Sequence, residues 1–179
     1  FALVMREYID VEGSGEQATT LQGRAIVVKG ASHSEIRNLT IKAYNGQNAV
    51  VGIRNENVSS LKISNVTIQT TSALGDFGIK NVDSELELYN IKINISAGNS
   101  QGYGIDNFRT ALLVRDSTIN VNSEFVSWGL LNEGGNVTLR NTTIDASAAS
   151  YTSQGLSATG VSGSLGAVYV ENSGISAAK

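Results

Sequence analysis

Residues 77–93 read FGIKNVDSELELYNIKI, and residues 103–119 repeat the pattern as YGIDNFRTALLVRDSTI. A third copy, WGLLNEGGNVTLRNTTI, spans residues 128–144. Each copy begins with an aromatic residue and glycine, has asparagine at its fifth position, continues with alternating aliphatic residues and ends in isoleucine. Such a repeat predicts a chain built from one small structural unit used many times.

The repeat extends beyond these three copies. The Gly-aliphatic-x-Asn element recurs every 25 or 26 residues, with a degenerate last copy; its glycines are Gly52, Gly78, Gly104, Gly129 and Gly155. A second element, Asn-x-x-Ile, begins at Asn38, Asn65, Asn90, Asn141 and Asn172, with Asp116 as a variant. The aliphatic residues ahead of this second element alternate with polar ones, which is the period of a β-strand.

The alternation predicts an all-β chain, because no repeat holds a stretch with the helical period. One unit cannot bury its apolar side alone, so we expect successive units to stack with equivalent strands about 4.8 Å apart. The predicted fold is a single-stranded, right-handed parallel β-helix of about six coils of 25–27 residues, with three short strands per coil. We expect one domain over residues 1–179. Its parts are a first coil and candidate cap at 1–24, regular coils at 25–158, and a last, truncated coil at 159–179 that carries the insertion GVSGS at 160–164.

The pattern G-I-x-N … L-x-I-x-N-V-T-I resembles right-handed parallel β-helix proteins of the pectin-lyase-like group. It is most similar to bacterial β-helix repeat proteins that have no assigned activity. The segment VEGSGEQATTLQG, residues 11–23, is similar to the opening coil of such domains. The resemblance covers nearly the whole chain and implies the fold, but this scaffold serves lyases, hydrolases, adhesins and tailspikes alike.

The composition of the chain argues against several kinds of partner and metal site. The formal net charge of −3 over 179 residues, without a basic run, argues against a nucleic-acid or polybasic membrane partner. The chain has no cysteine and a single histidine, His33, so thiolate and multi-histidine metal sites are excluded within one chain. His33 lies in the polar bend ASHSE and is expected at the surface rather than as a general base. No apolar stretch is long enough to predict a membrane span.

The asparagines of the second element lie an even number of positions after the aliphatic residues that precede them, so alternation along the strand puts both on the same side. We therefore expect Asn65, Asn90, Asn141 and Asn172 to point inward at a bend, in the left-handed conformation that asparagine tolerates. Stacked there, they would pass amide hydrogen bonds from coil to coil. Asn65-Val66-Thr67 and Asn136-Val137-Thr138 are sequons that would also allow glycosylation, but the structural ladder is the favoured interpretation.

An isoleucine or leucine follows two positions after each of the aromatic residues Phe77, Tyr103 and Trp128, so alternation puts the two side chains on the same side of the strand. This favours a stack of rings inside the coil. The alternative needs a bend just before each glycine. The rings would then form an outward stripe suited to sugar binding, and the glycines would leave a smooth outer strip beside them.

The resemblance implies that enzymes of this fold work on the Gly-Ile strand, where lyases use carboxylates, calcium and a basic residue and hydrolases use two or three aspartates. The outward column predicted for that strand holds one carboxylate; it reads Arg54, Lys80, Asp106, Leu131 and Ser157. Asp106 is expected to pair with Lys80 across the strands. Asp76, Lys80, Asp106 and Arg54 are therefore weak catalytic candidates. No cofactor or metal is expected, and calcium enters only under an enzymatic interpretation.

Threonine recurs on another outward column, after the asparagine bends. The positions are Thr40, Thr67, Lys92, Thr118 and Thr143. A flat threonine-rich sheet is typical of ice-binding solenoids, but Lys92 interrupts this one, and threonine is a common exposed strand residue.

The sequence thus favours a non-catalytic scaffold or adhesion-type domain of a secreted or cell-surface protein. Its expected partner is a polysaccharide or cell-surface glycan, bound on one face. A polysaccharide lyase or glycoside hydrolase is the alternative. Because an open β-helix end exposes unpaired strand edges, end-to-end or other homo-oligomer contacts are also expected.

Overall fold

The computed structural model describes residues 2–98, 100–160 and 166–178. All regular secondary structure in these residues is β-strand. The strands, in chain order, are β1 (Leu3–Val4), β2 (Val11–Glu12), β3 (Thr20–Gly23), β4 (Ile26–Lys29), β5 (Glu35–Asn45), β6 (Val50–Glu56), β7 (Leu61–Ser72), β8 (Asp76–Val82), β9 (Leu86–Ala97), β10 (Gln101–Phe108), β11 (Leu112–Arg115), β12 (Thr118–Ser123), β13 (Val126–Glu133), β14 (Val137–Arg140), β15 (Thr143–Ala148), β16 (Thr152–Thr159), β17 (Val168–Glu171) and β18 (Gly174–Ala178).

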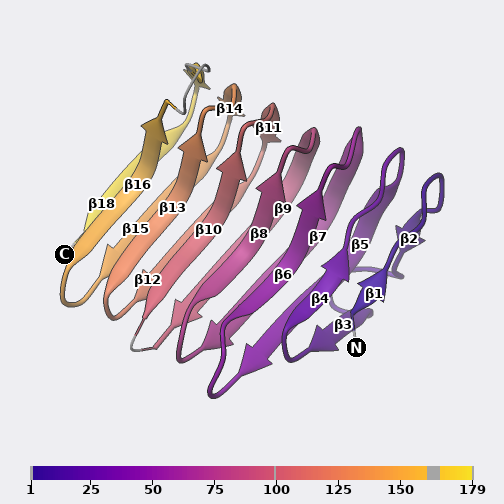
Figure 1. Cartoon of the computed structure of the whole chain (residues 1–179), viewed down its shortest axis with the longest axis horizontal. Helices are drawn as coiled ribbons and strands as arrows, with labels where there is room; N and C mark the ends of the chain where they lie inside the picture. The colour runs from indigo at the N-terminus through magenta and orange to yellow at the C-terminus, as the bar shows by residue number, and fades with distance from the viewer. Residues whose placement is uncertain (1, 99, 161–165, 179) are drawn as a thin grey trace.

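The strands form two parallel sheets that wind into a flattened solenoid (Figure 1). The first sheet has seven strands in the order β1-β4-β6-β8-β10-β13-β16, and we call its outer surface the first face. The second sheet has eleven strands. Every strand pairs with its equivalent in the next coil, so successive coils lie side by side from the N-terminal to the C-terminal end (Figure 1). The predicted parallel β-helix of about six turns is confirmed.

The second sheet is folded by a bend at the Asn-x-x-Ile element. Strands β5, β7 and β9 run through this bend without interruption, whereas later coils are divided there into two strands. The residue at each bend has a positive φ of 48° to 58°; these residues are Asn38, Asn65, Asn90, Asp116, Asn141 and Asn172. Asparagine and aspartate adopt this left-handed conformation more readily than other non-glycine residues. We call the surface before the bend the second face and the surface after it the third face.

The interior is filled by columns of aliphatic side chains. Ile53, Ile79, Ile105 and Leu130 are paired in register from β6 to β13, and each is fully buried. Burial of one such side chain contributes about 1.5–3 kcal/mol. Because every coil repeats the same inward positions, these contributions accumulate along the solenoid as one continuous core.

The first-face strands break the alternation of inward and outward residues at the glycine. Gly78 and Ile79 are both buried, although they are adjacent in β8. A Cβ on Gly78 would lie 2.7 Å from Cγ2 of Ile93 on the opposite wall and 2.6 Å from the carbonyl oxygen of Gly104. The glycines therefore face the interior, so they do not form the smooth outer strip that the alternative with outward rings predicted. Glycine is needed there because the third-face isoleucines fill the remaining space.

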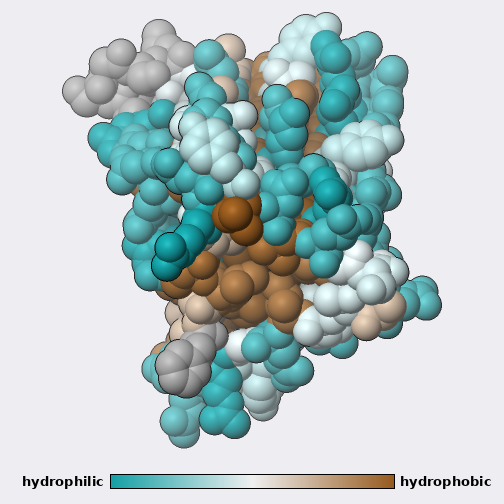
Figure 2. Space-filling view, turned by 90° about the vertical axis from the view of Figure 1, so that its right-hand side faces the viewer, coloured by the Kyte–Doolittle hydropathy of each residue, from teal (hydrophilic) through white to brown (hydrophobic). Residues whose placement is uncertain are grey.

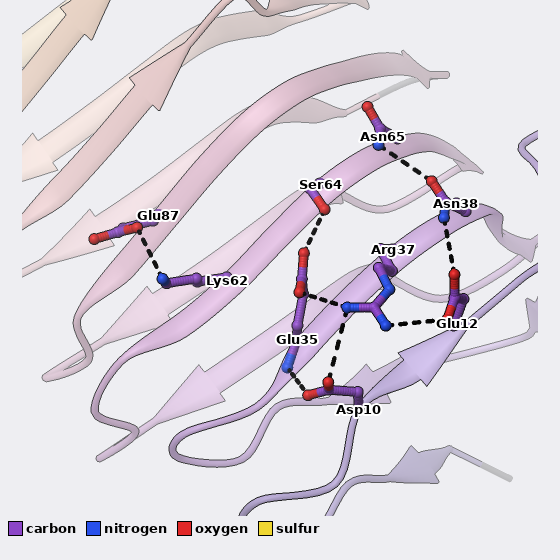
Figure 3. Close-up of polar contacts among 9 residues, drawn as sticks. All are labelled: Asp10, Glu12, Glu35, Arg37, Asn38, Lys62, Ser64, Asn65 and Glu87. Carbon is purple, nitrogen blue, oxygen red and sulfur yellow. Dashed lines mark hydrogen bonds and ion pairs between the residues drawn. The ribbon is translucent and has the colours of Figure 1, made fainter.

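The first coil is fastened to β5 by a charged network around Arg37 (Figure 3). Its guanidinium contacts Glu35 at 2.8 Å, Glu12 at 3.0 Å and Asp10 at 3.8 Å. The side chain of Asp10 also accepts a hydrogen bond of 2.8 Å from the backbone amide of Glu35. These contacts hold β2, a strand of two residues, where few ladder hydrogen bonds are available.

Figure 2 looks at the end of the solenoid nearest the N-terminus and shows apolar residues at its centre, ringed by polar ones. Leu3, Val4 and Ile9 are exposed in this region, and Val170 and Ile175 are exposed in the last described coil. Association through an end stays a prediction. The insertion expected at 160–164 lies outside the described residues apart from Gly160, so the predicted coil boundaries also stay untested. The described residues contain no helix with the length and apolarity of a membrane span.

Substituting Gly78→Ala should lower the stability of the fold. The added methyl group has no room between Ile93 and the Gly104 carbonyl, and overpacking of this kind costs about 1–3 kcal/mol. Thermal unfolding followed by circular dichroism measures the effect. Gly174→Ala is the matched control, because a Cβ at Gly174 meets nothing within 4 Å. Equal melting temperatures for the two variants would contradict the inward orientation of Gly78.

Candidate functional site

The most distinctive feature of the first face is a column of three outward aromatic side chains. The rings of Phe77 and Tyr103 are stacked with centroids 4.5 Å apart and planes at 5°. Tyr103 and Trp128 stack in the same way, at 4.6 Å and 15°. All three are half-buried on the outer surface, so the favoured expectation of an inward stack is wrong. The physical reason is the glycine, which turns inward together with the following aliphatic residue and shifts the preceding residue outward.

Stacking limits what the aromatic column can offer a ligand. Each ring covers a face of its neighbour, so a ligand meets mainly ring edges along the column. Lys80 Nζ lies 4.9 Å from the Phe77 ring centroid, in cation–π range. Trp128 is paired in register with Gln154, so no aromatic ring continues the stack into β16. At this end of the column the indole of Trp128 therefore has no further ring stacked on it.

The charged candidates on the first face are largely neutralised by neighbours. Lys80 Nζ lies 3.6 Å from Asp106 Oδ2, in the expected cross-strand pair. Arg54 forms an ion pair with Glu56 in its own strand. Burial raises the pKa of the Asp106 carboxyl, and the nearby ammonium of Lys80 offsets only part of that effect. The arrangement resembles a structural charge ladder more than a catalytic pair.

Asp76 does not join this outer group. Its side chain is fully buried at the start of β8, whereas Asp106 lies on the outer surface. One carboxylate oxygen, Oδ2, accepts a hydrogen bond of 2.9 Å from the backbone amide of Ser72, and Oδ1 has no hydrogen-bond partner among the described residues. Burial raises the pKa of Asp76 to about 6, against the hydrogen bonds from Ser72. Asp76 and Asp106 therefore cannot act together on one substrate bond.

A buried asparagine ladder runs beneath the first face, from the last residue of each Gly-aliphatic-x-Asn element. Asn55 Nδ2 donates to Asn81 Oδ1 at 3.2 Å, Asn81 to Asn107 at 2.8 Å, and Asn107 to Asn132 at 2.8 Å. The second amide hydrogen is also used: Asn81, for example, donates to the carbonyl of Ser84 at 2.8 Å. We call this set the inner ladder. No role was expected for these residues from the sequence. Each lies two positions after a buried isoleucine or leucine, and alternation along the strand therefore indicates that it points inward as well.

The asparagines of the second element form a different ladder on the outside of the bend. Asn65 Nδ2 donates to Asn38 Oδ1 at 3.1 Å and Asn90 Nδ2 to Asn65 Oδ1 at 2.8 Å. In later coils, Asn141 Nδ2 donates to Asp116 Oδ1 at 2.9 Å. Asn65 is half-buried, and Asn90, Asn141 and Asn172 are exposed, so their expected inward orientation is wrong. The left-handed backbone turns these side chains away from the core.

The remaining side chain that the sequence singled out is His33. His33 is exposed, as expected, and stacks on Tyr8 with ring centroids 5.0 Å apart. Among the described residues, no three histidine or acidic side chains are close enough together to hold a metal ion. Calcium binding by Asp76 and Asp106 has no geometric support, because one carboxylate is internal and the other is external.

Comparisons with known proteins do not identify the chain further. No family model matches it, and no curated protein matches it. A solved structure that it partly resembles is the A-module of the mannuronan C-5 epimerase AlgE4 from Azotobacter vinelandii. The two are 11% identical over 98% of this chain and 81% of that chain, with a TM-score of 0.23. A likeness this low supports no functional argument.

Replacing Asn107 by Ala should destabilise the fold more than replacing a surface asparagine. The substitution leaves the donor of Asn81 and the acceptor of Asn132 without partners, and each buried unsatisfied group costs about 1–3 kcal/mol. Asn122, exposed in β12, provides the control variant Asn122→Ala. Thermal unfolding compares the two. Similar losses of stability would show that the inner ladder is not a major stabilising feature.

Asp76→Asn should stabilise the protein at neutral pH but not in acid. Because the folded pKa of Asp76, about 6, exceeds its ordinary value, ionisation opposes folding. The opposition starts as pH rises through about 3.9 and is complete above pH 6. The melting temperature of the variant should therefore exceed that of the wild type at pH 7.5, with the gain disappearing near pH 3.5. The exposed Asp145→Asn variant is the control, and an equal pH-dependent gain there would refute the assignment.

Proposed function

We propose that this domain is a non-catalytic β-helix scaffold of a secreted or cell-surface protein and that its first face contacts carbohydrate. The observation that supports a non-catalytic role is that the two candidate carboxylates lie on opposite sides of the coil wall. Asp76 lies inside the coil, and Asp106 lies outside it in an ion pair with Lys80. Acid–base hydrolysis of a glycosidic bond needs two carboxyl groups that flank the same bond.

The carbohydrate contact is proposed from the aromatic column and its surroundings. Trp128 combines a half-exposed indole with a polar neighbour, Gln154, and sugar recognition commonly needs both kinds of contact. A second stacked pair, Phe125 and Tyr151, lies just ahead of β13 and β16 with centroids 5.2 Å apart, and both rings are exposed. Aromatic side chains thus gather where the third face turns into the first face.

The alternative is a polysaccharide lyase or glycoside hydrolase. The observation in its favour is the raised pKa of two aspartates near the first face, since general acids need such shifts. Two observations weigh against it. The full burial of Asp76 keeps substrate away from its carboxylate, and Lys80 is occupied by Asp106. The resemblance implies that a lyase would further need calcium, and among the described residues no three acidic side chains lie close enough together to hold it.

A glycan-array screen with and without calcium, followed by a product assay on each hit, tests the proposal. Binding without turnover is the expected result. Trp128→Ala should weaken the affinity for the bound glycan about threefold to tenfold, the scale of one aromatic contact. Tyr89→Ala, an exposed aromatic residue on the second face, is the control and should leave affinity unchanged. Product formation that is lost in Asp106→Asn would overturn the non-catalytic assignment.

A further inference from the structure

The third face carries a polar groove near the N-terminal end of the solenoid. Its floor is formed by outward side chains of β3, β5, β7 and β9, and its wall by the segment 14–19 between β2 and β3. The hollow has a volume of about 390 Å³. It lies on a different face from the aromatic column and takes in none of the catalytic candidates.

The wall of the groove is held in place by Glu16. Thr40 Oγ1 donates a hydrogen bond of 2.6 Å to the backbone carbonyl of Glu16, and Thr67 Oγ1 donates to its carboxylate. Both threonines are buried as a result. The flat, exposed threonine plane that an ice-binding surface requires is therefore absent from this part of the third face, and a walled hollow takes its place.

Two lysines on the floor have no anionic partner in the part of the chain that the structure describes. Lys42 and Lys92 are exposed and line the groove, and neither forms an ion pair within the described residues. This separates them from Lys62 and Lys80, which are each paired with a carboxylate. Glu16 is the acidic residue of the lining, and its carboxylate is already bound by Thr67.

The register fixes how the two lysines are spaced. Lys42 is paired with Gln69, which is paired with Asn94, so the amides of Gln69 and Asn94 continue the row that Lys42 begins. Lys92 lies two residues before Asn94 on β9, which is two strands away from β5. Two strand spacings correspond to about 9.6 Å between the coils that carry the lysines. The groove thus presents two cations separated by neutral amide groups.

We propose that this groove binds a sugar chain that bears anionic groups, either carboxylate or sulfate. Two separated ammonium groups match a ligand with repeated negative charges, and the amides of Gln69 and Asn94 match sugar hydroxyls. The lining has no aromatic or large aliphatic side chain to anchor a peptide. The same lack of aromatic side chains disfavours a single-stranded nucleic acid, whose bases stack on such rings. This proposal extends the glycan-binding role to a second site on a separate face.

Isothermal titration of the whole domain with three probes tests the groove: hexagalacturonate, a heparin-derived hexasaccharide and neutral cellohexaose. An anionic probe should bind more tightly than cellohexaose, and its affinity should fall as salt is raised. Lys42→Gln and Lys92→Gln should each weaken binding of the anionic probe about threefold to tenfold. The double variant should bind it no better than cellohexaose. Whichever anionic probe binds more tightly identifies the charged group.

Two control variants distinguish binding in the groove from binding elsewhere on the surface. Lys62→Gln makes the same change of charge on an exposed lysine of the second face and should leave binding unchanged. Trp128→Ala tests the aromatic column independently. The groove is refuted if Lys62→Gln weakens anionic binding as much as Lys42→Gln, or if no anionic probe binds better than cellohexaose. Loss of glycan binding in Trp128→Ala alone would refute the groove and retain the first-face proposal.

Discussion

The structure depends on keeping buried asparagine amides in register from coil to coil. Asn55, Asn81 and Asn107 each donate one hydrogen to the next amide, and Asn81 and Asn107 donate the other to a carbonyl of their own coil. A coil that lost or gained a residue on the first face would leave a buried amide without a partner, at a cost of about 1–3 kcal/mol. The near-constant interval between the glycines follows from this constraint.

The ladder is preceded by Gly30, where a Cβ would collide with Asn55 Oδ1, and it ends where Asn132 pairs with Ala158. The long insertion in the sequence follows Ala158, beyond the last amide that needs a partner.

The inner and outer ladders run in opposite directions. Inner amides donate toward the C-terminal coil, whereas outer amides donate toward the N-terminal coil. The first outer donor, Asn38, therefore needs an acceptor from the first coil, and Glu12 Oε1 accepts its hydrogen bond at 3.2 Å (Figure 3). Glu12 in turn pairs with Arg37, and this contact holds its pKa below the usual range. A carboxylate is well suited to this position, because it accepts from both partners and donates to neither. The charged network thus fastens the first coil and terminates a hydrogen-bonded row.

The fold was predictable because its main signal is the regular interval between repeats. That interval can be read without knowing which way each side chain points. The coil-to-coil partners follow directly from it, including the Lys80–Asp106 pair. Side-chain direction was not predictable from alternation alone, since Gly78 and Ile79 both point inward and reverse the parity of Phe77. Strict alternation also placed Asn65 inside, although its bend turns it outward. For Asn81 the same alternation gives the correct inward direction, because Asn81 lies two residues after the buried Ile79, but no role was expected for it. The groove could not be predicted either, because it needs the segment 14–19 to fold across strands that are remote in sequence.

The three faces share one backbone and differ in how their charges are satisfied. On the first face Lys80 and Arg54 are neutralised along or across strands, and on the second face Lys62 pairs with Glu87 at 3.9 Å. Surface pairs of this kind contribute little to stability, so their absence costs the fold almost nothing. That Lys42 and Lys92 have no carboxylate partner among the described residues is therefore compatible with a stable coil and leaves both cations available to a ligand. Because a solenoid repeats its backbone exposure in every coil, the positions where the repeat breaks are where specificity can arise. On the third face that break is the wall built around Glu16, beside these two lysines.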